Sequence, residues 1–443
     1  MAHDTSTLSF INRPIKTPFF YGWLILAVVA TGAFVATSIA GVVLGGIQYF
    51  IFEDTGWNRS SIGVAAAAGV WCSGVVAPFA GRLTDKYGPR TLMPLGAIYL
   101  GLTLFGLGWF HSLKYFYFAT ITARAISQPI LIGVVPRTIA VNFFLKRRNT
   151  ALALTGMFRP ISGAIIVQIV SLFASTYGWR SAFSFLGIFS LVLSLPMILI
   201  IRRRPEDLGL LPDGIRHEIS DSNETVLPKS ADLEPEKSRV TNYEQSSWTG
   251  REVLRTPAFW LVALTVMCSI TGSSAIGFSM VPYLAEEANL PASAAVGVLS
   301  LSTFLSLSNL GWGYVADKIS PRWAMMIALT GSGGVILYLF LVNSIVSGYV
   351  FGFCWGIIHS SLEVIVYMIL AQYFGRVSYG VIAGSLRPFE AAGLGLGQIL
   401  GPLMYDLLGN YSSMIIMSGG LQLVAACFIF LARPPRRNLS ITN

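Results

Sequence analysis

Six ionisable residues interrupt the long apolar blocks of this 443-residue chain. They are Arg124, Arg137, Arg159, Glu363, Arg387 and Glu390. An ionised side chain in the core of a bilayer costs about 3 kcal/mol or more, so a residue of this kind usually contacts a ligand, an ion or an opposite charge. The arginines exceed the glutamates by two positive charges, and a small anion is a natural group to neutralise them.

Arg159 and Arg387 are the strongest candidates for binding such an anion. Each lies ten or eleven residues after the start of its apolar block, about 15 Å deep at 1.5 Å per residue. A guanidinium can hold a carboxylate through two parallel hydrogen bonds. Each arginine precedes a proline, which frees backbone carbonyls and can bend a helix. The alternative is an internal ion pair, because Glu390 follows Arg387 by three residues on the same helix face.

Two further arginines lie in one apolar block. Arg124 is a third candidate for the substrate site, with hydrogen bonding between helices as the competing interpretation. Arg137 lies closer to the end of the block, where a long side chain can extend to the membrane surface. We therefore assign Arg137 a structural role.

Three residues are candidates for carrying a proton. Glu363 and His359 lie four residues apart, one above the other on a helix. Histidine changes its charge near neutral pH, so the pair could exchange a proton. The alternative is a neutral, hydrogen-bonded glutamate with a structural role. Glu390 is the rival proton carrier.

The composition explains where these residues lie. Hydrophobic residues make up 54% of the chain and charged residues only 12%, against about 25% charged in a soluble protein. The apolar residues form blocks long enough to cross a bilayer as helices of about 20 residues. We count twelve such blocks and predict an all-α membrane protein with twelve transmembrane helices.

Lysine and arginine set the predicted orientation. Of the 30 Lys and Arg residues, only Arg59, Lys114 and Arg180 fall in segments on one predicted side of the membrane. Positively charged loops face the cytoplasm. We therefore expect a cytoplasmic N-terminus (1–18), a six-helix half (19–202), a cytoplasmic loop with a short interfacial helix (203–256), a second six-helix half (257–433) and a cytoplasmic tail (434–443).

The two halves repeat one motif. The segment 81–90 reads Gly-Arg-Leu-Thr-Asp-Lys-Tyr-Gly-Pro-Arg, and the segment 313–322 reads Gly-Tyr-Val-Ala-Asp-Lys-Ile-Ser-Pro-Arg. The pairs Arg159-Pro160 and Arg387-Pro388 also occupy similar places in the fifth and eleventh blocks. A parallel repeat of six helices is typical of secondary transporters. The halves are therefore expected to be pseudo-symmetric.

The motif G-x-x-x-D-x-x-G-x-R resembles the signature of the major facilitator superfamily, and its second copy differs at Ser320. This resemblance implies a cytoplasmic charge latch that stabilises the outward-open state. The latch residues would be Gly81, Asp85, Gly88, Arg90, Asp317 and Arg322. Arg124 resembles a buried arginine of the superfamily, for which the resemblance implies a role in proton coupling or gating.

Looser motifs are similar to those of the monocarboxylate and oxalate–formate porters. They include Phe-Tyr-Gly-Trp at 20–23, the Lys-Arg-Arg entry to the fifth span at 146–148, and Gly-Gln-Ile-Leu-Gly-Pro at 397–402. The eighth span lacks the arginine that the monocarboxylate porters often carry. The resemblance implies transport of a small carboxylate, and this departure puts a lactate-type site in doubt.

We predict a secondary active transporter of a small organic anion. It is expected to function as a monomer in the cell membrane, and one form of the hypothesis couples transport to protons. The alternatives are a carrier of a neutral or hydrophobic solute, with the arginines in ion pairs, and a membrane sensor without transport. We predict no enzyme, because the sequence has no HExxH motif, no GxSxG motif and no His/Cys metal cluster, and the absence of a P-loop excludes an ATP-driven pump. We expect no cofactor, no metal and no nucleic-acid partner.

Overall fold

A computed structural model describes residues 20–144, 148–203, 250–375 and 379–435. The predicted N-terminal segment 1–18, residues 204–249 of the predicted central loop and residues 436–443 of the tail lie outside these ranges. At the end of that loop the chain forms the short helix α10 (Gly250–Val253), and the Val253 side chain is buried in the core of the second half.

The N-terminal half comprises six membrane-length helical segments. They are α2 with α3 (Tyr21–Thr37, Gly41–Thr55), α4 (Arg59–Tyr87), α5 (Pro89–Trp109), α6 with a π-helical turn and α7 (Leu113–Ser127, Gln128–Gly133, Val134–Phe143), α8 (Arg148–Tyr177) and α9 (Trp179–Ile200).

The C-terminal half repeats this plan. It comprises α11 (Pro257–Glu286), α12 with α13 (Ala292–Leu305, Asn309–Ile319), α14 (Pro321–Leu337), α15 with α16 (Ile345–His359, Leu362–Phe374), α17 (Tyr379–Leu408) and α18 (Ser412–Leu431). Ten segments of the described chain are long and apolar enough to cross a membrane, and the pair α12–α13, bent by 50°, makes an eleventh. With the 30-residue α17, the twelve predicted helices are confirmed.

Several spans are broken where the sequence led us to expect continuous helices. Span one is interrupted between α2 and α3, where Thr37 and Ser38 donate their hydroxyls to carbonyls one turn earlier. Ser360 and Ser361 do the same between α15 and α16. Such side-chain bonds compete with the helical ladder and bend helices. His359 and Glu363 therefore lie on either side of a break rather than on one continuous helix.

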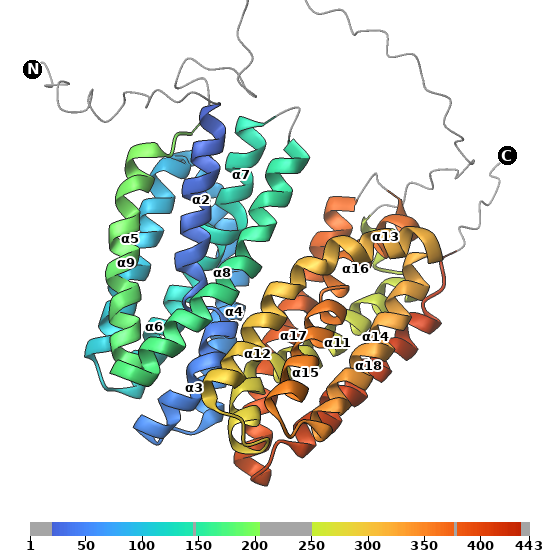
Figure 1. The fold of residues 1–443 in the computed structure, drawn as a ribbon. Coiled ribbons are helices and arrows are strands. Elements are labelled where there is room, and N and C mark those ends of the chain that lie inside the picture. The colour runs from blue at the N-terminus through green and yellow to red at the C-terminus, as the bar shows by residue number, and fades with distance from the viewer. Residues whose placement is uncertain (1–19, 145–147, 204–249, 376–378, 436–443) are drawn as a thin grey trace, which may run out of the picture.

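The two halves share an apolar core at one end of the bundle only. We call the end that holds the start of α2 and the end of α18 the terminal end, and the opposite one the far end. One core cluster runs through the N-terminal half and continues into the far end of the C-terminal half, where it includes Phe278, Leu284 and Tyr411. The terminal end of the C-terminal half has a separate cluster around Phe259 and Phe374. Accordingly, the halves meet at the far end and diverge toward the terminal end (Figure 1).

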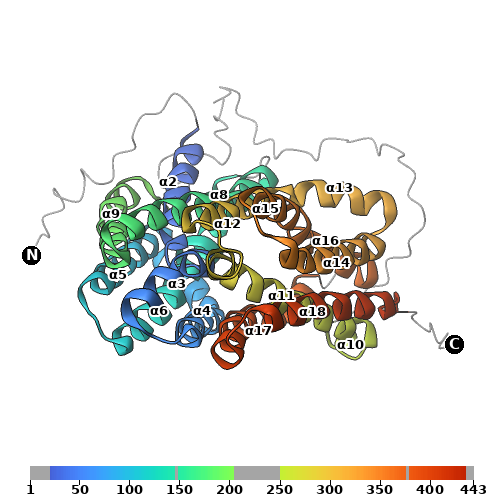
Figure 2. The same cartoon turned by 60° about the horizontal axis from the view of Figure 1, so that its bottom comes forward.

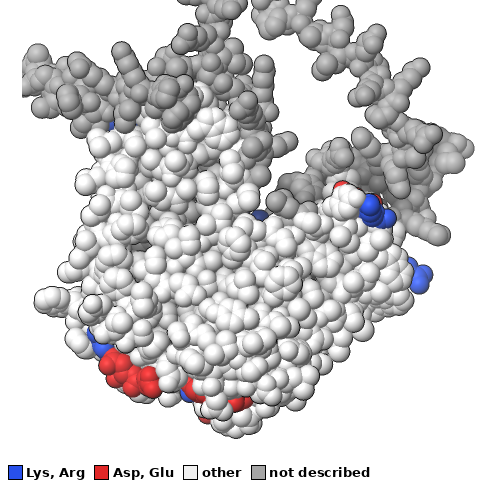
Figure 3. Space-filling view, viewed as in Figure 1, with Lys and Arg blue, Asp and Glu red and all other residues white. Residues whose placement is uncertain are grey.

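The outer surface is suited to lipid. Large apolar side chains such as Trp109, Leu172 and Val346 are more than half exposed. On the face drawn in Figure 3, charged residues lie toward the two ends and an uncharged belt separates them. An apolar belt between polar ends is the surface expected of helices in a bilayer.

The repeated turns adopt the same backbone conformation in both halves. Gly88 has φ 82° and ψ 160°, and Ser320 has φ 75° and ψ 140°. Only glycine adopts this region without strain, and a side chain there costs about 1–3 kcal/mol. Ser320, the one residue of the second copy that differs from the motif, therefore has a strained backbone conformation.

We expect Ser320→Gly to raise the free energy of unfolding by about 1 kcal/mol, because it removes this strain. Gly88→Ser, the mirror change, should lower the free energy of unfolding by a similar amount, because it puts a side chain on this strained backbone. Steric contact should add little, since the new Cβ would meet only the flexible Arg203 side chain, at 3.3 Å. Thermal unfolding of the purified variants in detergent checks both. A lower midpoint for Ser320→Gly would show that the serine stabilises its turn.

Candidate functional site

Hydrogen bonds between the halves start near the middle of two long helices. The Ser300 hydroxyl on α12 donates to the Ala164 carbonyl on α8 at 2.7 Å. On the other side of the bundle, the Trp71 indole N–H on α4 donates to the Ala391 carbonyl on α17 at 3.0 Å. From this level to the far end, α4 packs along α17 and α3 along α11 (Figure 2). The halves are therefore in contact from the middle of the bundle to its far end.

Arg159 and Arg387 lie about one helical turn from these contacts, on the side of the terminal end. Arg159 precedes Ala164 on α8, and Arg387 precedes Ala391 on α17. Both side chains are exposed. The two arginines that the sequence singled out thus lie at the level where the halves part.

Arg387 forms an ion pair with Glu390, but much of its side chain stays exposed. Its Nη1 lies 2.9 Å from Glu390 Oε2, while its side chain remains 59% exposed and that of Glu390 only 17%. The Tyr367 hydroxyl on α16 donates to the other Glu390 oxygen at 2.6 Å. Both carboxylate oxygens are therefore engaged, and the guanidinium has further N–H groups for a ligand.

Arg124 is buried and binds a backbone carbonyl at the break in span one. Its side chain is 5% exposed, and Nη1 donates to the Ile39 carbonyl at 3.0 Å. Ile39 lies between α2 and α3, where the interrupted helix leaves carbonyls free. This geometry favours helix-to-helix hydrogen bonding for Arg124.

Arg137 lies on α7, shortly after the π-helical turn Gln128–Gly133, and its side chain is exposed. The structural role predicted for it stays a prediction.

The predicted proton carriers lie in different surroundings. His359 ends α15 and stacks on Trp355, with ring centroids 5.0 Å apart. Glu363 lies in α16, but its side chain is outside what the structure describes. Glu390 is the candidate that the structure brings together with a substrate-site arginine.

The predicted latch residues gather at the terminal end. Gly81 lies in α4, Gly88 forms its C-terminal cap, and Arg90 begins α5. Asp85 lies in α4, with its side chain outside the described part. Asp317 is exposed at the end of α13. The latch itself stays a prediction.

Arg322 takes a different partner from the one that a charge latch suggests. It donates to the backbone carbonyls of Ile429, at 3.3 Å, and of Phe430 at the end of α18. A cation at this position satisfies free carbonyls and complements the negative end of the helix dipole.

The far end is closed by a cluster around Arg59, which we call the clasp. Arg59 begins α4, and its Nη2 lies 2.8 Å from Glu286 Oε2 at the end of α11. Its Nη1 donates to the Tyr411 hydroxyl. The guanidinium also lies 4.1 Å from the ring centroid of Phe52 and 3.6 Å from that of Tyr405. The clasp therefore joins the halves through charge, hydrogen bonds and aromatic contacts.

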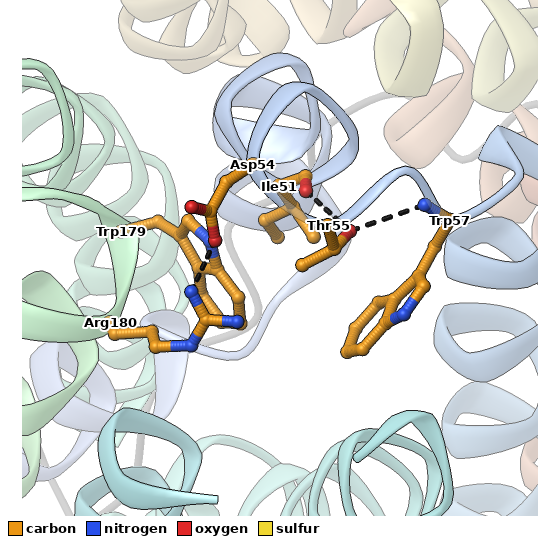
Figure 4. A network of polar contacts seen from close by, with 6 residues as sticks. All are labelled: Ile51, Asp54, Thr55, Trp57, Trp179 and Arg180. Carbon is orange, nitrogen blue, oxygen red and sulfur yellow. Dashed lines mark hydrogen bonds and ion pairs between the residues drawn. The ribbon is translucent and has the colours of Figure 1, made fainter. Parts of the chain in front are cut away.

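A second far-end network stays within the N-terminal half. Arg180 and the Trp179 indole N–H, at the start of α9, both bind the Asp54 carboxylate, as Figure 4 shows. Thr55 links this turn to the Ile51 carbonyl at 2.6 Å and to the Trp57 amide at 3.3 Å. This network fixes α3 against α9 without touching the other half.

The model of the Major Facilitator Superfamily matches the sequence over residues 23–312 and 262–442. The chain belongs to this superfamily. Membership accounts for the twelve helices in two halves and points to a non-enzymatic transporter protein. The predicted superfamily is thus confirmed, whereas the monocarboxylate and oxalate–formate branch stays a prediction.

Three comparisons show which known proteins the chain resembles. It is 25% identical over 285 residues to the membrane sensor protein UhpC of Salmonella typhimurium, covering 63% of this chain and 61% of that one. The chain thus spans about three-fifths of the length of that relative. It is 22% identical to the sialic acid transporter NanX of Escherichia coli over 92% of both chains. A bacterial homologue of the lysosomal transporter Spinster, solved in an inward-facing and occupied conformation, has the same fold, with a TM-score of 0.72 at 15% identity over 94% of this chain and 97% of that one.

Proposed function

We propose that this superfamily member is a secondary active carrier of a small organic anion, with a carboxylate as the preferred chemistry. The observation that carries the proposal is Arg387, whose side chain stays 59% exposed despite its ion pair and lies at the level where the halves part. Arg159 is exposed at the corresponding level of α8. Both guanidiniums can bind a carboxylate in the bidentate mode. NanX, which aligns with nearly the whole chain, is named for an acid, which also favours an anionic substrate.

The carrier works by alternating access in this proposal. The halves are closed at the far end by the clasp and parted at the terminal end. The excess of Lys and Arg in the loops at the terminal end favours a cytoplasmic location for that end. The described conformation is then inward-facing, and rocking of the halves would open the far end to the outside.

Glu390 provides a route to proton coupling. Its carboxylate neutralises Arg387 and competes with a substrate carboxylate for the same guanidinium. Protonation removes this competition and leaves Glu390 able to hydrogen-bond to Tyr367. An anion and a proton would then bind together, which is the requirement for symport.

We expect Glu390→Gln to raise the affinity for an organic anion at a fixed pH, because glutamine cannot compete as a charge for Arg387. If Glu390 carries the coupled proton, the wild-type affinity depends on pH and that of Glu390→Gln does not. The measurement is a binding titration of both proteins at several pH values, with an acid that stays ionised throughout. An equal pH dependence in both proteins would assign the proton to another residue.

The proposal is tested by thermal stability against a panel of mono- and dicarboxylates, because a ligand that binds the folded state raises the unfolding midpoint. Stabilisation by one acid, lost in Arg387→Gln, is the expected result. No stabilisation by any acid would favour the neutral-solute alternative.

The Arg387–Glu390 pair is the observation that favours a neutral solute, since it shows that the arginine has an internal partner. The likeness to UhpC favours the sensor alternative. Transport assays in proteoliposomes separate the three functions. A sensor transports no solute, a neutral-solute carrier transports a neutral solute but not the acid, and an anion carrier transports the acid.

A further inference from the structure

We propose that a pocket at the far end of the N-terminal half binds a phospholipid whose headgroup carries a primary ammonium. The pocket has a volume of about 470 Å³ and lies between α3, α8 and α9. Two carboxylates, one arginine and three aromatic rings line it, namely Glu53, Asp54, Arg180, Phe50, Tyr177 and Trp179. All six belong to one half, so this inference does not depend on the anion site between the halves.

The charges of the pocket are the first step. Asp54 is neutralised by its ion pair with Arg180, and its Oδ2 also accepts the Trp179 indole N–H at 3.0 Å (Figure 4). Glu53 is exposed and has no basic partner within the described part of the chain, where its one hydrogen bond comes from the Tyr49 hydroxyl at 3.0 Å. The second oxygens of both carboxylates can therefore accept hydrogen bonds from a ligand. The surplus of one negative charge favours an ammonium group.

The surroundings of the pocket favour a lipid as the source of that ammonium. Tyr177 and, about one turn below it on α8, Leu172 are exposed. Phe173 stacks on Phe185 of α9 with ring centroids 4.7 Å apart, and Phe185 stacks on Phe189 at 6.1 Å. This row of rings leads from the pocket into the apolar belt, where acyl chains lie. A soluble amine has no use for such an apolar path, whereas a lipid headgroup requires one beside it.

The phosphate of the same headgroup has a partner on a different helix from the carboxylates. Arg180 uses one nitrogen for Asp54, and its guanidinium has further N–H groups for a phosphate oxygen. It lies in the first turn of α9, whose N-cap Gly178 has no side chain to bind the free N–H groups of the helix end. The positive end of a helix beside an arginine suits a phosphate. Both charges of a zwitterionic headgroup are thus matched, whereas an anionic headgroup brings no cation to Glu53.

The test compares two lipids that have the same acyl chains and different headgroups. Dioleoyl phosphatidylethanolamine and dioleoyl phosphatidylglycerol are titrated into the detergent-purified full chain at pH 7.5, and phosphoethanolamine supplies the same ammonium without chains. Native mass spectrometry counts the bound molecules, and the thermal unfolding midpoint reports binding to the folded state. Glu53→Gln is the test variant, because glutamine loses the charge and can still accept from Tyr49. Glu287→Gln, which removes an exposed carboxylate from the far end of the other half, is the control.

In the wild type and in Glu287→Gln, the ethanolamine lipid should bind about tenfold or more tightly than the glycerol lipid, because it adds a charge-assisted hydrogen bond. Glu53→Gln should bind both lipids alike. Equal binding of the two lipids by the wild type, a preference that survives in Glu53→Gln, or one that is lost in Glu287→Gln as well overturns the inference. Phosphoethanolamine that binds as tightly as the lipid would assign the pocket to a soluble amine and overturns it too. All of these outcomes leave the proposed anion carrier intact.

Discussion

Arg387→Gln is expected to lower the affinity for the transported anion by about 10- to 100-fold and to leave the folded protein stable. The variant loses charge-assisted hydrogen bonds, which contribute about 1.5–3 kcal/mol. Stability should change little because the Arg387 side chain is 59% exposed, so its removal leaves no cavity. Binding titrations and uptake into proteoliposomes measure the first effect, and thermal unfolding without ligand measures the second.

Two controls make this result specific. Arg387→Lys keeps the charge but loses the planar fork, so it should recover only part of the affinity. The double variant Arg387→Gln, Glu390→Gln removes the ion pair as a unit. If the arginine only neutralises Glu390, the double variant should transport like the wild type. A carrier that stays inactive in the double variant needs the arginine for its substrate.

Arg59→Ala is expected to shift the conformational equilibrium toward the state that is open at the far end. Arg59 contributes the Glu286 ion pair, the Tyr411 hydrogen bond and the Tyr405 ring contact, all of which join the two halves. Its side chain is only 12% exposed and that of Glu286 is 21%, so water weakens the pair less than at an open surface. Losing about 1–3 kcal/mol corresponds to a population shift of roughly 5- to 150-fold.

Pairs of spin labels can measure this shift. One pair joins Glu53 and Leu407, which are exposed at the far end on different halves, and a second joins Arg82 and Lys318 at the terminal end. Arg59→Ala should lengthen the first distance and shorten the second. Arg180→Ala is the matched control, because it breaks the ion pair with Asp54 inside one half and should move neither distance. Unchanged distances in Arg59→Ala would show that apolar packing alone closes the far end.

The helices and their repeat could be predicted because both are local in the sequence. An apolar block of about 20 residues has to become a helix in a bilayer, whatever its neighbours are. The glycines of span eleven were predictable for the same reason. A Cβ on Gly393 would lie 2.8 Å from the Met267 carbonyl of α11, so the close approach of α17 requires small residues.

The candidate site was predictable only in part. Arg387 and Glu390 lie three residues apart on one helix, so their pairing follows from the spacing. The bond from Tyr367 depends on how α16 packs against α17, and the sequence does not show that packing.

The clasp was missed because its partners are far apart in the chain. Arg59 was used only as one of the few positive charges on the predicted outer side. Its partners Glu286 and Tyr411 come from the ends of other helices, and only the contact between the two halves brings them together. A single sequence shows no relation between them.

The most direct test of an anion carrier built on Arg387 is exchange in proteoliposomes loaded with the acid that stabilises the protein best. External labelled acid should accumulate transiently in vesicles with the wild-type chain, and Arg387→Gln vesicles should match protein-free vesicles. Uptake of the acid by Arg387→Gln at the wild-type rate, or no exchange by a wild-type protein that the acid stabilises, would contradict this account.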